Sequence, residues 1–223
     1  GPGDDDDKTP VLRLLSEGLG AARNARISLA YLSAFAARAD MAVVTLFLTL
    51  WVVQAATGES DSPAEATARA GMIVGMAQLS AVVWAPIFGI IGDKLDRLSL
   101  LVLAFLIATL GYGWVASLDD VLAPSSIPAL LTLGAGLASG QLASTVLLAE
   151  EAPEQFRGSC YGVQAFCGAL GILALSAGGG RLFDALGPNA PFIAIALANG
   201  FVLFCAALRR ATELRRTVSQ PAV

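Results

Sequence analysis

Two charged residues lie two positions apart inside a long apolar segment. Arg38 and Asp40 are both near the middle of residues 27–53. A charged side chain at the centre of a bilayer costs at least about 2.5 kcal/mol, so it normally faces protein or water and has a partner or a task. Residues two apart on a helix project about 200° away from each other. We therefore expect Arg38 and Asp40 to face different neighbours instead of each other.

Asp40 is the only carboxylate well inside an apolar run, and the chain contains no histidine. A buried carboxylate can exchange a proton near neutral pH when its surroundings disfavour the charged form. Asp40 is therefore the candidate proton carrier. Arg38 is a candidate to bind an anionic substrate group, or to hold Asp40 charged through a water. A structural role, in which each residue pairs with a polar group on another helix, explains the same pattern and stays open.

Uncharged polar residues occur inside four other apolar runs: Gln78, Gln141, Gln164 and Asn199. Such side chains bind ligands in some membrane proteins and hold helices together in others. They are candidates for contact with a substrate.

The elements that position these residues follow from composition. The 223 residues are 56% hydrophobic and 14% charged, and the mean hydropathy is +0.69, which is too apolar for a soluble domain. Six runs have about the 20 residues that a helix needs to cross a bilayer. They are residues 27–53, 70–91, 98–118, 127–149, 160–179 and 191–208. The sequence predicts an all-α, polytopic membrane protein.

Basic residues predict the orientation and the flanking segments. Eleven of the 14 Lys and Arg residues fall on the side that includes the N-terminus, so the positive-inside rule places both termini in the cytoplasm. Residues 1–8, GPGDDDDK, read as a protease tag or as a charged linker between two halves of a transporter. Residues 9–25 predict an amphipathic helix on the membrane surface. We expect residues 26–210 to form the six-helix transmembrane bundle and residues 211–223 to form a cytoplasmic tail.

The turn after the second run carries a motif. In the stretch GIIGDKLDRL, the spacing of Gly89, Asp93, Lys94 and Arg97 resembles the loop between the second and third helices of each half of a major facilitator superfamily transporter. In that family the aspartate pairs with the basic residue and closes the cytoplasmic side, so the resemblance implies a conformational latch at these four residues. Asp96 stands where the family usually has glycine, which would alter the latch. A simple positive-inside anchor is the alternative.

Further residues resemble the second half of such a transporter. The segment after the fourth run carries Glu150, Pro153, Arg157 and Gly158, and the fifth run ends in GGGRLFDALGPNAPF. The resemblance implies helices seven to twelve of the family, arranged as two inverted three-helix repeats with substrate held near the midplane. The helices that match the first, second, fourth and fifth runs line the family's cavity. Gln78, Gln141 and Gln164 are therefore better candidates than Asn199.

The resemblance implies half of a secondary transporter working by alternating access. We expect proton-coupled export of small hydrophobic compounds, as an antiporter, because no cluster of cavity charges is evident. The expected location is the cell membrane, and richness in alanine and glycine favours a bacterial inner membrane. The expected partners are the lipid bilayer, a small-molecule substrate, a proton, and the missing N-terminal half or a second copy. The alternative is a non-transporting membrane module that acts in assembly or scaffolding.

The sequence lacks the residues that several other functions require. No nucleotide-binding GxxxxGK motif occurs, and no span holds two carboxylates at catalytic spacing. The absence of histidine excludes a His-based triad and a His-ligated metal. We expect no enzymatic activity, no cofactor, no metal and no nucleic-acid partner.

Overall fold

The computed structural model describes residues 17–59 and 61–218, with side chains described to residue 215. Within these residues it has six helical segments that are long and apolar enough to cross a membrane, and no strand. In chain order they are α2 (Ala25–Ala42) continued by η1 (Val43–Leu48) and α3 (Thr49–Gly58), α4 (Pro63–Gly92), α5 (Arg97–Ala116), α6 (Ile127–Glu151), α7 (Arg157–Leu186) and α8 (Ala190–Val218). The short 3-10 turns η2 (Pro124–Ser126) and η3 (Glu154–Phe156) precede α6 and α7. The prediction of an all-α, six-helix membrane protein is confirmed.

Polar caps outside the apolar runs set several helix ends, so the helices are longer than the predicted spans. Before α4, the Ser62 backbone N–H donates to Glu65 Oε2 (2.9 Å), and the Glu65 N–H donates to Ser62 Oγ (3.4 Å), a reciprocal capping box. Pro63 follows at the first helical position, where its missing N–H costs nothing. At the far end of α7, Gly187 takes a positive φ of 100°, which glycine tolerates without strain.

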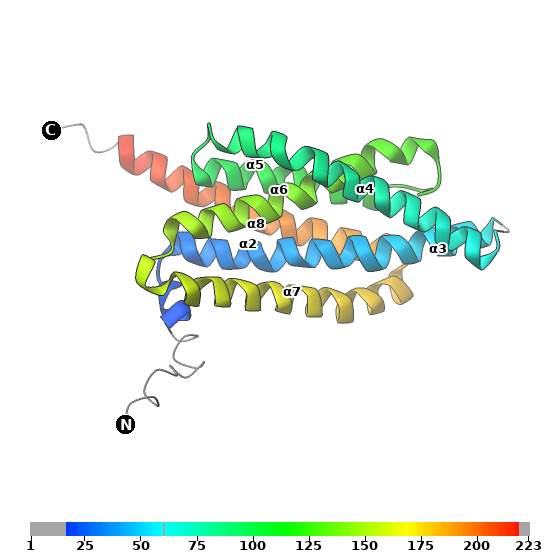
Figure 1. The fold of residues 1–223 in the computed structure, drawn as a ribbon, viewed down its shortest axis with the longest axis horizontal. Coiled ribbons are helices and arrows are strands. Elements are labelled where there is room, and N and C mark those ends of the chain that lie inside the picture. The colour runs from blue at the N-terminus through cyan, green and yellow to red at the C-terminus, as the bar shows by residue number, and fades with distance from the viewer. Residues whose placement is uncertain (1–16, 60, 219–223) are drawn as a thin grey trace, which may run out of the picture.

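The long helices lie side by side in a bundle (Figure 1). α2 has contacts with α6, α7 and α8, and α5 packs between α6 and α8. Two glycines allow close approach: a Cβ at Gly134 would lie 2.0 Å from the backbone oxygen of Ala77 on α4, and one at Gly171 would lie 2.1 Å from that of Phe35 on α2. Small residues at such crossings let helices in a membrane gain van der Waals contact.

Burial is uneven among the helices. In the most apolar stretch of α4 only 17% of the residues are buried, against 61% for the segment that contains α6. Two apolar clusters make up the core, one around Phe105 and Leu147 and one around Tyr112 and Phe192. α4 therefore presents most of its apolar surface to whatever surrounds this chain, whether lipid or another bundle.

The predicted flanking segments fall partly outside the described residues. Of the predicted surface helix, residues 17–21 are helical, and Tyr31 of α2 donates a hydrogen bond to the Gly18 carbonyl (2.9 Å). Residues 9–16 and the predicted tag or linker lie outside the described part. At the other terminus, α8 continues through Val218, so most of the predicted tail is helical.

Candidate functional site

A polar pocket with a volume of about 200 Å³ lies where α2, α6 and α7 meet. Its polar lining consists of Arg38 from α2, Gln141, Ser144 and Thr145 from α6, and Tyr161 and Gln164 from α7. Residues three or four apart share a helix face, which is why three neighbours on α6 and two on α7 converge. The described lining residues include one cation and no carboxylate.

Arg38 is exposed to this pocket, near the middle of the 34-residue segment Ala25–Gly58. Its side chain lies against α7 at Gly168, where a Cβ would be only 2.5 Å from Arg38 Cγ. Arg38 forms no ion pair or hydrogen bond with any residue that the structure describes. The pocket therefore holds a guanidinium group whose charge the described protein does not neutralise.

Two glutamine side chains in the pocket are fixed through their nitrogen atoms. Gln141 Nε2 donates to the Ala37 carbonyl of α2 (2.6 Å), and Gln164 Nε2 donates to the Ser144 carbonyl (3.2 Å) and hydroxyl (3.3 Å). Within the described residues, neither Oε1 atom accepts a hydrogen bond and the Tyr161 hydroxyl has no partner. These groups are free to bind a solute.

Asp40 lies on the other side of α2, with no exposed surface. Asn199 Nδ2 of α8 donates to Asp40 Oδ1 (2.8 Å), whereas Asp40 Oδ2 and Asn199 Oδ1 have no hydrogen-bond partner among the residues that the structure describes. A Cβ at Gly140 of α6 would lie 3.9 Å from Asp40 Oδ2, so the carboxylate is enclosed by α2, α6 and α8. No basic residue in the described part of the chain forms an ion pair with it.

The structure thus brings together some candidates and separates others. Arg38, Gln141 and Gln164 share the pocket, while Asp40 is turned away from it. Gln78 is half-buried on α4 and is not among the residues described as lining a pocket. Asn199, which the sequence ranks below the glutamines, is the hydrogen-bond partner of Asp40.

Sequence reasoning missed three hydroxyl side chains of the pocket. Ser144 and Thr145 lie three and four positions after Gln141, and Tyr161 lies three positions before Gln164. The signal was present as helical spacing from each glutamine. A search for polar side chains at these intervals would have found all three.

An apolar pocket of about 360 Å³ lies between α4 and α6. It is lined by Met76, Leu79, Ser80, Val83, Trp84, Ile87 and Leu131. Leu131 of this pocket lies ten residues before Gln141 of the polar pocket on α6, which places the two about 15 Å apart along the helix axis and about 80° apart around it. α6 therefore contributes residues to both an apolar and a polar pocket.

The residues of the predicted latch lie where α4 ends and α5 begins. The turn is shorter than the motif, because α4 continues as helix through Gly89 to Gly92. Asp93 follows as the C-cap residue, and neither Asp93 nor Lys94 forms an ion pair in the described part of the chain. Arg97 pairs not with Asp93 but with Glu150 at the end of α6.

The physical reason for this pairing is the start of α5. Asp96 is its N-cap: it accepts hydrogen bonds from the Ser99 backbone N–H (3.0 Å) and from the Ser99 hydroxyl. Arg97 is then the first helical residue, next to the end of α6. Burial raises the pKa of Asp96, but the hydrogen bonds from Ser99 and the charge of Arg210 outweigh it and hold the pKa below its ordinary value.

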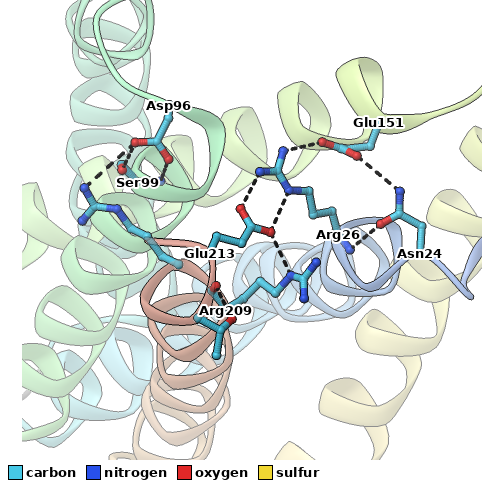
Figure 2. Close-up of polar contacts among 9 residues, drawn as sticks. Asn24, Arg26, Asp96, Ser99, Glu151, Arg209 and Glu213 are labelled. Atoms are coloured by element: carbon cyan, nitrogen blue, oxygen red, sulfur yellow. Dashed lines mark hydrogen bonds and ion pairs between the residues drawn. The ribbon is translucent and has the colours of Figure 1, made fainter. Parts of the chain in front are cut away.

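A charge cluster at the same end of the bundle joins segments far apart in sequence (Figure 2). Arg26 Nη1 lies 2.6 Å from Glu151 Oε1, and Arg26 Nη2 lies 2.5 Å from Glu213 Oε2. Glu213 also pairs with Arg209 (3.0 Å), and Asn24 donates to Glu151 (3.3 Å). The start of α2 is thereby tied to the ends of α6 and α8, which lie at one end of the molecule (Figure 1).

Six long apolar helices around buried and pocket-lining polar residues define a polytopic membrane protein of the transporter class. Residues 30–222 match the Major Facilitator Superfamily, and the chain belongs to this family. The family predicted from the loop motifs is confirmed.

Known relatives and a solved structure agree with this assignment. The chain is 28% identical over 216 residues to the magnetosome protein MamZ of Paramagnetospirillum magneticum, covering 97% of this chain and 33% of that protein. It is 33% identical over 147 residues to the class G tetracycline resistance protein of Vibrio anguillarum, covering 66% and 36%. The crystal structure of a D-xylose–proton symporter shares the fold, with a TM-score of 0.61 at 17% identity, over 86% of this chain and 52% of that one. The chain thus spans about a third of the length of these two relatives.

Proposed function

We propose that this chain forms one six-helix half of a secondary active transporter that works by alternating access. The observation that carries the proposal is the polar pocket on the α2, α6 and α7 face, with Arg38 exposed at mid-membrane depth. In this family, substrate lies between two six-helix bundles near the midplane. The pocket would form one wall of that site, and the missing N-terminal half or a second copy would supply the other.

The loop motifs favour the second half of the transporter, helices seven to twelve. The charge cluster supports a cytoplasmic position for both termini, since Arg26, Arg97, Arg209 and Arg210 gather at one end of the bundle. The cluster, together with the Arg97–Glu150 pair, would extend the predicted latch: these contacts would hold the cytoplasmic ends together in one state and part in another.

Export of small hydrophobic compounds in exchange for protons is the proposed activity. The apolar pocket along α6 offers surface for such compounds, and one relative is named for tetracycline resistance. Asp40 is the proposed proton carrier, because it is enclosed, unpaired with any described cation and attached to the same helix as Arg38. Its separation from the polar pocket implies that the proton and the substrate are coupled through movement of α2 and not by direct contact.

Transport in vesicles tests this activity. The chain, co-expressed with a companion half, should accumulate a tetracycline against a gradient when a proton gradient is imposed. Asp40→Asn should abolish the proton-driven component, whereas Thr49→Val, a polar change farther along the same segment, should leave it intact. Undiminished transport by Asp40→Asn would remove Asp40 from the proton pathway.

The mass of the detergent-purified particle separates this proposal from its alternative. Two copies, or one copy with a second polypeptide, would fit a complete pathway. A stable single chain that transports nothing would favour a membrane module that acts in assembly or scaffolding. We propose the cell membrane as the location.

A further inference from the structure

We infer that the solute bound at the polar pocket carries an anionic group, and that Arg38 is the residue that binds it. This inference rests on the proposed transport site, which it deepens by naming a substrate class. The substrate class is a small organic acid, with a carboxylate or phosphate on a largely apolar body.

The charge of Arg38 supports an anionic ligand. Arg38 lies in the middle of a membrane span, where a charge normally has a partner. Three arginines at the ends of the bundle, Arg26, Arg69 and Arg97, each pair with a carboxylate. Arg38 pairs with none among the described residues, and the one described carboxylate inside its span, Asp40, is bonded to Asn199 on the far side of the helix. An anionic ligand would supply the missing counter-charge.

The position of the Arg38 side chain also suits an anion. Gly168 leaves the space that the Arg38 stem occupies, so the contact with α7 restricts where the guanidinium can go. A guanidinium presents a planar set of N–H donors that matches a carboxylate or phosphate through two parallel hydrogen bonds. The guanidinium of Arg38 is thus held at the pocket, where its planar N–H donors can bind an oxyanion.

Further hydrogen-bonding groups surround Arg38 in the pocket. Tyr161 offers a hydroxyl without a described partner, which can donate to an oxyanion. The Oε1 atoms of Gln141 and Gln164 remain free to accept from a hydroxyl or amide of the same solute. At about 200 Å³ the pocket is smaller than the roughly 300–1,000 Å³ typical of sites for drug-sized ligands. It therefore takes the polar head of a solute, while the apolar body extends beyond it.

Chemical protection of Arg38 tests the inference without a transport assay. The purified chain is treated with the arginine reagent phenylglyoxal, and modification of each arginine is followed by peptide mass spectrometry. Benzoate and phenyl phosphate should slow modification of Arg38 severalfold, whereas benzamide, which has the same ring without the charge, should not. Arg181, exposed near the end of α7, is the internal control and should react equally in all samples. Protection by benzamide, or by neither anion, would overturn the inference.

A second measurement covers the case in which Arg38 reacts too slowly to follow. Benzoate should raise the unfolding temperature of the wild-type chain more than chloride at equal ionic strength does. Arg38→Gln should lose this increment and Arg38→Lys should keep part of it. An equal increment in Arg38→Gln would contradict the assignment.

The outcome also separates the inference from the proposed function. Specific protection by anions in a chain that transports nothing even when co-expressed with a companion half would support the anion site and refute the transporter. Transport that is indifferent to Arg38→Gln would refute the anion site and leave the transporter in place.

Discussion

At the scale of single residues, helical geometry predicts the directions of the Arg38 and Asp40 side chains but not their neighbours. Their spacing predicts opposite directions, and the structure places Arg38 in the pocket and Asp40 against α8. The sequence alone could not predict which residues of other helices contact Arg38 and Asp40. Asn199 stands about 160 positions after Asp40, and only the packing of α8 against α2 and α5 brings the two together. A ranking based on family cavity helices therefore placed Asn199 last.

Removing the Asn199 amide tests whether it stabilises Asp40. In Asn199→Ala both carboxylate oxygens of Asp40 would be buried without a hydrogen bond, which costs about 1–3 kcal/mol per unsatisfied group. We expect a lower unfolding temperature of the detergent-purified chain, with a loss of this size. Thr132→Val, which removes an exposed hydroxyl that bonds only to the Pro128 carbonyl of its own helix, should change stability little. Equal stability of Asn199→Ala and wild type would show that the Asp40–Asn199 bond contributes nothing.

At the scale of elements, the sequence predicts the number of helices better than their ends. Apolar runs locate six spans, but α4 begins at Pro63 because of its capping box, and α5 begins at Arg97 because Asp96 caps it. The length of an apolar run reflects the thickness of the bilayer core, whereas capping residues set helix ends that lie outside that core. The π-helical segment η1, directly after α2, carries no recognisable pattern in VVTLFL, although π-helical turns are frequent at functional sites.

The cap at Asp96 gives a prediction with a pH dependence. Asp96→Ala should destabilise the chain by about 1 kcal/mol, and Asp96→Ser should restore most of the loss, because serine also accepts from the backbone N–H. Since the pKa of Asp96 is lowered in the folded chain, its charge stabilises the fold above the pKa of an unfolded aspartate, about 3.9. That contribution is lost as the pH falls through the lower, folded pKa.

Unfolding temperatures measured between neutral and acidic pH check this dependence. The advantage of wild type over Asp96→Ser should shrink as the solution is acidified. An advantage that stays constant down to the lowest pH at which the chain remains folded would show that the charge of Asp96 is irrelevant to the cap.

Two glycines one turn apart on α7 contact different parts of α2. Substituting Gly171 tests the packing of the two helices, and substituting Gly168 tests the placement of the Arg38 side chain. A Cβ at Gly171 would meet the backbone oxygen of Phe35 at 2.1 Å, so Gly171→Ala must push α2 and α7 apart. Overpacking of this kind costs typically about 1–3 kcal/mol, which should appear as a lower unfolding temperature. The three atoms nearest to a Cβ at Gly168 all belong to the Arg38 side chain, with Cγ at 2.5 Å, so Gly168→Ala must shift that side chain; it should cost less stability than Gly171→Ala and weaken anion protection of Arg38. Similar stability losses in both variants would contradict this division.

At the scale of the whole molecule, different faces of the bundle expose different kinds of side chain. The bundle has polar side chains on the α2, α6 and α7 face, while α8 exposes large apolar residues such as Phe201 and Phe204. In a membrane the apolar side suits lipid. The polar side requires water or protein, because hydrocarbon cannot satisfy its hydrogen-bonding groups.

Cysteine labelling in native membranes tests this division of surfaces. In a chain whose own three cysteines are replaced by serine or alanine, Thr145→Cys should react with a membrane-impermeant methanethiosulfonate, because the thiolate that reacts forms only in contact with water. Phe204→Cys should not react, although Phe204 is 58% exposed in the isolated chain, since lipid would cover it. Reaction at Phe204→Cys but not at Thr145→Cys would reverse the assignment of the two faces and remove the polar pocket from any transport pathway.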